Sequence, residues 1–352
     1  MKTIYSVISG FSAGTKYAIA TVIETKGSTP QKAGSFAIFT KSGLVAGTIG
    51  GGVLEGKVHK LSVESIESGE SGIYHFDLDY DISYTQDAIC GGNAKVLVEI
   101  YTVEAGSVFE QISNSVRKRQ SGVLLTIVEN RENGKIHPLR YWVTSDKNDL
   151  PSDYKKLIGK DIDSLLLSGI NGRFDEKMIS PDKKYEPARI LLEPIFPPPG
   201  LVIAGAGHIG KALAHLASRL DFEVIVIDDR PEFANFHNIP EADQIIVNDI
   251  GLAIENIDKQ SDTYIVIVTR GHNDDAKALK SCINSGAGYI GMIGSRTKIG
   301  QMHRSFIENG WTTEQRWSVI HAPVGLEIRS KTVEEIAVSI AAQLVMKKNK
   351  GI

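Results

Sequence analysis

The chain has 352 residues, of which 42% are hydrophobic and 23% are charged, values typical of a globular protein with a sizeable core and room for two domains. The formal net charge of −3 gives no general attraction to nucleic acids or anionic membranes. No apolar run approaches the roughly 20 residues that span a bilayer, and the first residues lack the cleavage site of a signal peptide. The two cysteines, Cys90 and Cys282, lie far apart and form no disulfide framework, so we expect a cytoplasmic protein.

The first half of the chain predicts strands and a helix separated by glycine-rich loops. Residues 102–195 mix helical and strand signals with charged loops. The sequence therefore predicts an α/β domain, rich in glycine loops, over residues 1–195. Its clearest elements are strands at 18–25, 35–40 and 94–101 and a helix at 53–69.

Glycine is concentrated in three loops of this half: 26–35 (KGSTPQKAGS), 47–52 (GTIGGG) and 90–92 (CGG). The second loop and its continuation nearly match the P-loop, but Val58 stands where a Ser or Thr hydroxyl must bind magnesium, which excludes an NTPase of that type. A glycine loop that leads into a helix presents backbone N–H groups to an anion; the alternative is a tight turn that requires positive φ. Glu55 either complements the helix dipole or caps the loop. The candidate ligand-binding residues are Gly27, Ser28, Gly47, Gly50, Gly51, Gly52, Glu55, Gly91 and Gly92.

Cys90 is the candidate reactive thiol. Its glycine neighbours leave the sulfur little covered, which allows a ligand to reach it. Cys282 instead shares a helical apolar stripe with Leu279 and Ile283, so it is expected to be an ordinary buried residue. Because a thiolate is a nucleophile and a ligand of soft metals, Cys90 is the better candidate for a function.

A proline-rich connector, FPPPG at 196–200, separates the two halves. Three consecutive prolines cannot continue a helix or a central strand. Short apolar runs then alternate with helical segments, which predicts a parallel, doubly wound sheet of the Rossmann type over residues 196–352. The expected strands are 201–205, 223–228, 243–247, 263–269 and 289–294, and the expected helices are 208–220, 272–285, 295–309 and 332–347.

The first strand of this domain ends in GAGHIG, which has the G-x-G-x-x-G spacing of dinucleotide-binding domains. In such domains Gly205 would allow the tight turn, Gly207 the approach of a pyrophosphate, and Gly210 close packing of helix on strand. Asp228 ends the second strand, where a carboxylate bonds ribose, and Arg230 follows, where it would meet a 2′-phosphate or adenine. The alternative is a Rossmann-like domain whose glycines serve only the fold. We predict that these glycines and Asp228 line a nucleotide-sized cleft.

Polar residues also follow the later strands, at the edge where α/β proteins bind ligands. Each has an ordinary alternative, as a helix cap, a solvated side chain or the partner of an acidic loop. His272 and Asp275 are three residues apart on one helix, but two ligands are too few for a metal site. The candidates at this edge are His208, Arg270, His272, Arg296 and His321.

Together these stretches resemble the xanthine dehydrogenase accessory protein family (XdhC/CoxI-like), which are molybdenum-cofactor maturation factors. The chain departs from that family at Gln31 and Lys32, where relatives often carry Arg, and at Val53, where some carry Cys; these positions bear on anion contacts and sulfur handling. Residues 102–195 are the least diagnostic part. The matching stretches are GSTP, GTIGGGVLE, CGG, LVIAGAGHIG, VIDDRPEFAN, TRGHNDD, YIGMIGSRTK and HAPVGLEI.

The resemblance implies a protein that binds molybdenum cofactor, supports its sulfuration and delivers it to xanthine dehydrogenase or a related molybdenum hydroxylase. It implies a cysteine desulfurase as a further partner, allows a homodimer, and makes Cys90 the candidate contact for molybdenum or sulfur. We expect GTIGGG to cradle an anionic part of molybdopterin, and NAD(P) or another nucleotide to be the candidate ligand of the second domain.

The alternative function is an NAD(P)-dependent oxidoreductase, which explains GAGHIG but leaves GTIGGG and CGG unexplained. We therefore expect a cofactor-insertion chaperone rather than an enzyme, and we assign no catalytic residue.

Overall fold

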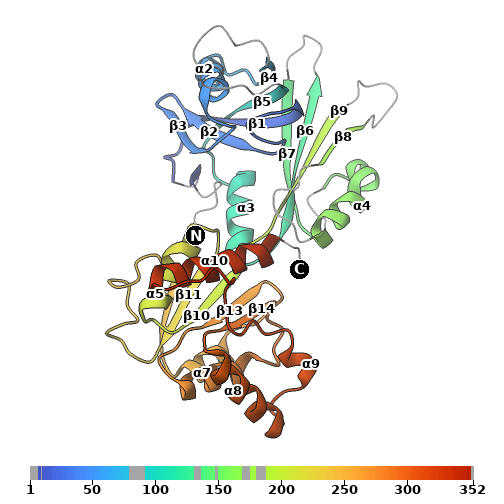
Figure 1. Ribbon diagram of the computed structural model, residues 1–352. Coiled ribbons are helices and arrows are strands. Elements are labelled where there is room, and N and C mark those ends of the chain that lie inside the picture. Colours follow the sequence, from blue (N-terminus) through green and yellow to red (C-terminus); the bar gives the residue numbers. More distant parts are fainter. Residues whose placement is uncertain are drawn as a thin grey trace. The chain divides into compact units, whose positions relative to one another are not determined.

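The computed structural model describes residues 7–8, 10–78, 92–130, 136–146, 150–168, 175–179 and 188–349. The chain divides into two compact units, Lys2–Pro197 and Pro198–Ile352, which are described separately (Figure 1). In the described part of the chain, no helix is long and apolar enough to cross a membrane.

The N-terminal unit begins with an antiparallel five-stranded sheet in the order β3-β2-β1-β5-β4. Helix α2 (Gly52–Ser68) covers one face of this sheet, because Leu54, Val58 and Ile66 pack on alternate residues of its strands. The outer strand β3 has a bulge where its pairing with β2 shifts register. The strands are β1 (Lys16–Gly27), β2 (Phe36–Thr40), β3 (Gly43–Gly47), β4 (Gly72–Asp77) and β5 (Gly92–Thr102).

A second antiparallel sheet of the same unit accounts for the region that the sequence left ambiguous. It contains β6 (Gly122–Asn130), β7 (Ile136–Val143), β8 (Asp175–Ile179) and β9 (Ala188–Ile195), in the order β7-β6-β9-β8. Helix α4 (Ser152–Ser168) packs on one face. Helix α3 (Val108–Arg117) packs against residues of both sheets.

A buried ion pair and an apolar cluster join the two sheets. Ile23 and Leu97 of the first sheet pack on Val128 and Leu191 of the second. Beside them, the Arg140 side chain of β7 donates from Nε to Glu99 Oε1 of β5 at 3.0 Å. The side chain of Glu99 is 0% exposed and that of Arg140 is 7% exposed, so neither charge has access to water as an alternative partner.

The C-terminal unit is built on a parallel five-stranded sheet in the order β12-β11-β10-β13-β14, which confirms the predicted doubly wound sheet. A parallel bridge between Gly291 and His321 extends the order by one residue beyond β14, so the arrangement follows the 3-2-1-4-5-6 order of Rossmann domains. The strands are β10 (Gly200–Ala204), β11 (Glu223–Asp228), β12 (Gln244–Val247), β13 (Thr263–Ile267) and β14 (Tyr289–Met292).

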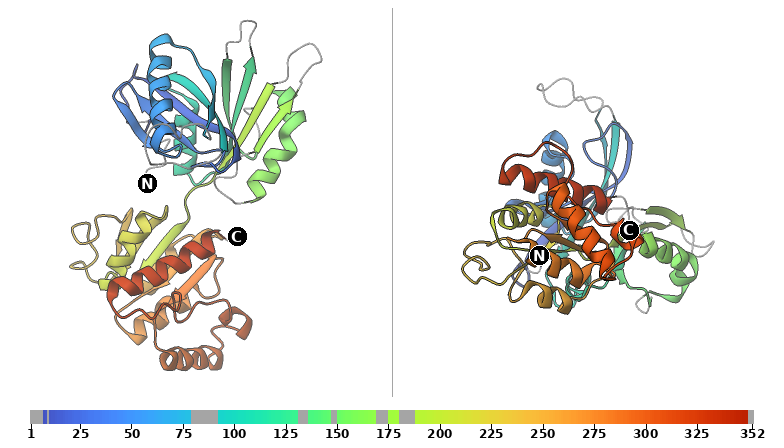
Figure 2. Two further views of the ribbon diagram at one scale, coloured as in Figure 1. Left: turned by 45° about the horizontal axis from the view of Figure 1, so that its top comes forward. Right: turned by 60° about the horizontal axis from the view of Figure 1, so that its bottom comes forward.

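Helices cover both faces of this sheet (Figures 1 and 2). Helices α5 (His208–Ser218) and α10 (Val333–Asn349) pack on one face. The other face carries α6 (Ile250–Asn256), α7 (His272–Cys282) and α8 (Arg296–Glu308), and the short α9 (Glu314–Trp317) follows α8. Because α5 follows β10 on one face and α7 follows β13 on the other, the chain changes direction between these neighbouring strands. In open α/β sheets, ligands bind at this switch point.

Candidate functional site

The glycine turn after β10 is shaped partly by the fold itself. Gly205 has φ 120°, and a Cβ there would lie 2.5 Å from the carbonyl oxygen of Val268. A Cβ on Gly210 would lie 1.9 Å from the carbonyl oxygen of Gly205. No side chain fits at either place, so these two glycines are required by the packing of α5 on β10 and need no ligand to explain them.

Gly207 differs from its two neighbours. Its backbone is extended, with φ −70° and ψ −170°, a conformation open to any residue, and a Cβ there would meet no atom within 4 Å. It caps α5 without a side chain. Within the part of the chain that the structure describes, the N–H groups of His208, Ile209 and Gly210 donate no hydrogen bond. The turn thus presents bare backbone and unsatisfied donors, as an anion site at a helix start does.

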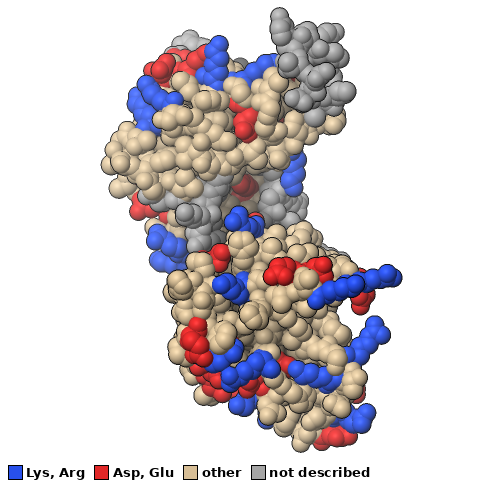
Figure 3. Space-filling model, turned by 60° about the vertical axis from the view of Figure 1, so that its left-hand side comes forward, with Lys and Arg blue, Asp and Glu red and all other residues tan. Residues whose placement is uncertain are grey.

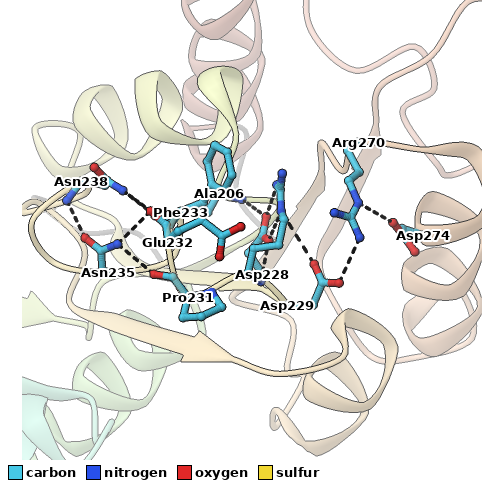
Figure 4. A network of polar contacts seen from close by, with 11 residues as sticks. Ala206, Asp228, Asp229, Pro231, Glu232, Phe233, Asn235, Asn238, Arg270 and Asp274 are labelled. Carbon is cyan, nitrogen blue, oxygen red and sulfur yellow. Dashed lines mark hydrogen bonds and ion pairs between the residues drawn. The ribbon is translucent and has the colours of Figure 1, made fainter.

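The Asp228 carboxylate lies beside this turn, but its oxygens are already occupied (Figure 4). Oδ2 accepts from the Ala206 N–H at 2.7 Å and from Arg230 Nη2 at 2.9 Å. Oδ1 accepts from the N–H of Arg230 at 3.1 Å and from its Nε at 2.8 Å. Burial acts to raise the pKa of Asp228, but these hydrogen bonds outweigh it and hold the pKa below its usual value.

Three further ion pairs extend this network, and the first joins Arg230 Nε to Asp229 Oδ1 at 3.8 Å. Arg230 stacks on the Phe233 ring at 4.0 Å, which keeps its guanidinium on Asp228. Arg270, which follows β13, donates from Nη2 to Asp229 Oδ2 at 3.2 Å, and its Nε lies 3.6 Å from Asp274 Oδ2. Asp229 follows β11, so its contact with Arg270 joins the two strands that flank β10 (Figure 4).

The remaining candidates at this edge do not join one site. His272 is exposed, whereas Asp275 is fully buried, where it accepts from Thr269 Oγ1 at 2.5 Å and pairs with Lys298. Arg296 is an exposed first residue of α8.

His321 lies at the far edge of the sheet and stacks on Tyr289 at 4.8 Å. Its burial, followed by the charge of Lys347, lowers the pKa of His321. Cys282 is buried as expected, and burial raises the pKa of its thiol to about 12.

In the N-terminal unit, the predicted loops come together at one end of the first sheet. Gly27, at the end of β1, pairs with Gly92, at the start of β5. A Cβ on Gly92 would lie 2.5 Å from the carbonyl oxygen of Lys26 and 2.6 Å from that of Ser28. The last residue of the third loop, Gly92, therefore lies against the first loop. Cys90 and Gly91 lie outside the described residues.

The second loop packs on the first as well. A Cβ on Gly50 would lie 2.4 Å from Pro30 Cβ, so this glycine is required by close approach. Gly47, Gly51 and Gly52 also have positive φ, at 79°, 68° and 58°. The tight-turn explanation is thus satisfied throughout GTIGGG, whatever the loop binds.

Glu55 resolves the alternative that the sequence left open, because it caps the loop. Its Oε2 accepts from Thr48 Oγ1 at 2.8 Å and from the N–H groups of Ile49 at 3.2 Å and Gly51 at 3.4 Å. Within the described part of the chain, the next three N–H groups, of Gly52, Val53 and Leu54, donate no hydrogen bond. The donors open to an anion are therefore those of Gly52, the last residue of the glycine loop, and of the two residues that follow it in the first turn of α2.

Two pockets were not anticipated from the sequence. One, of about 330 Å³, lies at the ends of β1, β4 and β5 and is lined by Glu24, Lys26, His75 and Lys95, among others. Lys95 Nζ donates to Glu24 Oε2 at 2.5 Å, and this bond is the main cause that lowers the pKa of Glu24. The lining residues of this pocket come from three strands, so no local sequence pattern could reveal the pocket.

The larger pocket, of about 670 Å³, belongs to the C-terminal unit. It lies between α5, the segment 237–241 and the start of α10, and its polar lining includes Lys211 and His237. A helical pattern shows which side chains share the face of α5, but it does not show what lies opposite them.

Figure 3 shows the distribution of charged side chains on one face of the molecule. On the face drawn in Figure 3, basic and acidic side chains alternate, and no broad patch of one sign forms on the residues described there. Among the described residues, no three His, Cys, Asp or Glu side chains come together to hold a metal ion.

The fold and these sites define a Rossmann-type domain joined to a domain of clustered glycine loops. Comparison with known proteins identifies both parts: residues 201–344 match the XdhC Rossmann domain, and residues 11–77 match the XdhC and CoxI family. The chain belongs to the XdhC and CoxI family, as the sequence motifs predicted.

Individual relatives agree with this assignment. The uncharacterized protein YqeB of Escherichia coli (strain K12) is 34% identical over 152 residues, which are 43% of this chain; the chain spans 28% of that protein. A probable xanthine dehydrogenase subunit from Bacillus subtilis (strain 168) is 25% identical over 338 residues, which cover 93% of this chain and 92% of that protein. A crystal structure from Bacillus halodurans described as a xanthine dehydrogenase has the same fold, with a TM-score of 0.78 and 22% identity over 99% of this chain and 95% of the other.

Proposed function

We propose that the protein is an accessory factor that binds molybdenum cofactor, supports its sulfuration and delivers it to xanthine dehydrogenase or a related molybdenum hydroxylase. Membership of the XdhC and CoxI family supports this function, as does the likeness, over nearly the whole chain, to a relative named as part of a xanthine dehydrogenase. We also propose a cysteine desulfurase as the source of sulfur.

The observation that carries the proposal is the convergence of the three N-terminal loops. Gly27 pairs with Gly92, the last residue of CGG, and Gly50 packs on Pro30, so GSTP meets both GTIGGG and Gly92 although these are separated in sequence. Unsatisfied N–H groups and the exposed Lys26 lie around this end of the sheet, and Gly92, which lies there too, follows Cys90 by two residues in the sequence.

The cargo is anionic, and the residues at this end fit an anion. The first turn of α2 offers the N–H groups of Gly52 to Leu54 together with the positive end of a helix of 17 residues. Lys26, whose side chain is 77% exposed, lies in the neighbouring loop and makes a 3.7 Å ion pair with Glu24 that an anion would compete for, and Lys32 is exposed there too. These groups would hold the phosphate of molybdopterin, while Cys90 would contact its molybdenum or sulfur.

For the C-terminal unit we propose that NAD(P) or another nucleotide binds at the switch point. Gly207 supports this site, because its lack of a side chain has no explanation in φ or in packing. A phosphate approaching the bare backbone would explain it. Sustained hydride transfer from such a nucleotide to a small substrate would instead favour the oxidoreductase function.

Val53 provides the test of the cargo site. It is exposed at the start of α2, so Val53→Glu adds a negative charge beside the open donors without disturbing the core. Two unit charges about 6 Å apart repel by roughly 0.7–3 kcal/mol between solvent-like and surface-like dielectric constants. We therefore expect the molybdopterin that copurifies with the protein to fall by about threefold or more.

Val53→Gln is the matched control, since glutamine has nearly the same shape as glutamate but carries no charge. We expect it to retain the wild-type content of molybdopterin, measured as the fluorescent oxidised pterin per mole of protein. An acidic residue in the first turn also favours the helix, so Val53→Glu should unfold no earlier than Val53→Gln. Equal pterin content in the two variants would refute the placement of the anion at α2.

A further inference from the structure

Two neighbouring carboxylates stand at the end of β11, and they differ in access. The side chain of Asp228 is 2% exposed, and that of Asp229 is 45% exposed. Each oxygen of Asp228 accepts two hydrogen bonds: Oδ2 from the Ala206 N–H and from Arg230 Nη2, and Oδ1 from the backbone N–H and the Nε of Arg230. A carboxylate oxygen has two lone pairs, so Asp228 has no acceptor capacity left for a ligand.

Arg230 cannot leave Asp228 at little cost. Its guanidinium makes two charged hydrogen bonds to that carboxylate and stacks on Phe233 at 4.0 Å. Bidentate contacts of this kind hold both side chains in place. The role of Asp228 in this arrangement is to fix the Ala206 N–H, and with it the glycine turn on either side of Ala206.

Asp229 and Arg270 have the opposite character. Their 3.2 Å contact is exposed, with the Arg270 side chain 55% exposed, and exposed ion pairs are weak. It also runs from the strand on one side of β10 to the strand on the other, over the edge where Gly207 leaves the backbone bare. A ligand that enters the switch point meets this pair.

We propose that Asp229, rather than Asp228, is the carboxylate that binds the ribose hydroxyls of a nucleotide, and that Arg270 turns from Asp229 to the nucleotide phosphates. Asp228 is then a positioning residue of the glycine turn. This inference rests on the nucleotide site proposed above and names the group that selects its ligand.

The same arrangement sets the chemical class of the nucleotide. A ribose hydroxyl can donate to the Asp229 carboxylate, whereas a 2′-phosphate would bring negative charge against it. Arg230, whose Nε also lies 3.8 Å from Asp229 Oδ1, is held on Asp228 by two charged hydrogen bonds, and Arg270 is assigned to the other phosphates, so neither is available to neutralise a 2′-phosphate. The site therefore favours a dinucleotide with an unmodified ribose, of the NAD type, over its 2′-phosphorylated form.

Titration calorimetry of the full-length protein with NAD+ and with NADP+ tests the inference. We expect the wild type to bind NAD+ about tenfold or more tightly than NADP+. Asp229→Asn should weaken NAD+ binding about fivefold or more and narrow the ratio of the two dissociation constants. Glu232→Gln is the matched control, because it removes one charge from the same exposed segment and should leave both constants within about twofold.

Asp228→Asn should act differently, since its effect passes through the turn. It should weaken the two nucleotides alike and speed amide hydrogen exchange in the peptide that contains Ala206, which Asp229→Asn should not do. If Asp228→Asn fails to fold, the comparison of Asp229→Asn with Glu232→Gln still decides the matter.

Two results would overturn the inference in distinguishable ways. If the wild type binds NAD+ and Asp229→Asn keeps both its affinity and its selectivity, then Asp229 is not the ribose ligand, although the nucleotide site stands. If the wild type binds neither NAD+ nor NADP+, the proposed dinucleotide site itself is wrong, and the role of Asp229 falls with it.

Discussion

Replacing Gly207 with alanine separates the needs of the fold from those of a ligand. The added methyl group would meet no atom within 4 Å, and the backbone has φ −70°, so the folded chain accepts it without strain. A phosphate that approaches the same backbone would collide with the methyl group. We expect Gly207→Ala to keep its stability and lose nucleotide affinity.

The magnitudes follow from the place of Gly207 as the N-cap of α5. Alanine in place of glycine reduces the conformational freedom of the unfolded chain and so stabilises the folded protein by about 0.4–1 kcal/mol. Alanine is also a poorer N-cap than glycine, by up to about 1 kcal/mol. These terms nearly cancel, so the free energy of unfolding should change by less than about 1 kcal/mol. Losing one hydrogen bond to a charged phosphate costs about 1.5–3 kcal/mol, or roughly 10- to 150-fold in affinity.

Denaturant unfolding and calorimetry with NAD+ measure the two quantities on the same preparation. Gly210→Ala is the contrasting variant, because its methyl group would lie 1.9 Å from the carbonyl oxygen of Gly205. Its free energy of unfolding should therefore fall, whereas that of Gly207→Ala should stay nearly unchanged. Wild-type affinity in a stable Gly207→Ala variant would refute the argument, because a ligand phosphate would then not approach this backbone.

Three further predictions concern other parts of the chain. Cys90→Ser should lower the sulfuration of the bound cofactor, or its retention, with little change in unfolding; full activation of the client enzyme by that variant would contradict the role of the thiol. Burial lowers the pKa of His321 below its ordinary value of 6.5, so the unfolded chain binds that proton more strongly and stability falls as the pH drops below about 6.5. His321→Gln should flatten this part of the pH profile, measured by urea unfolding between pH 5 and 8, and an unchanged slope would argue against it. Arg140→Met leaves Glu99 buried without its charge partner and should cost about 3–5 kcal/mol, most of which Arg140→Met combined with Glu99→Leu should restore; additive losses in the double variant would refute the pairing.

The parallel sheet of the C-terminal unit was predictable, because its central strands β10, β11 and β13 are short, largely buried apolar runs and helices follow β10 and β13. The roles of Gly205 and Gly210 were predictable too. A tight turn after a strand and close packing of the next helix need glycine at fixed positions within one short stretch of sequence. The sequence also placed Asp228 beside the turn. It could not show that Arg230, two residues on, occupies that carboxylate, because this depends on the path of the chain after β11.

The second sheet of the N-terminal unit was beyond local reasoning. Strands β6 and β9 pair although Gly122 and Ile195 stand far apart in sequence, and only the folded chain shows that they are neighbours. Strand β3 was missed for another reason: it is a short edge strand with Gly43 and Gly47 at its ends, and glycine is a turn signal. The sequence could not decide whether Glu55 complements the helix dipole or caps the loop, because both roles require the same residue at the same position. Only the hydrogen bonds of its side chain show that it caps the loop.

The capping of GTIGGG by Glu55 affects how much of the interaction energy with a ligand would appear as affinity. Because Thr48, Ile49 and Gly51 are already tied to one carboxylate oxygen, the loss of conformational freedom that glycine suffers on ordering occurs when the protein folds. Little ordering is then left for the encounter, so more of the interaction energy appears as affinity. Glu55→Ala would release the loop and move that ordering step to the moment of binding.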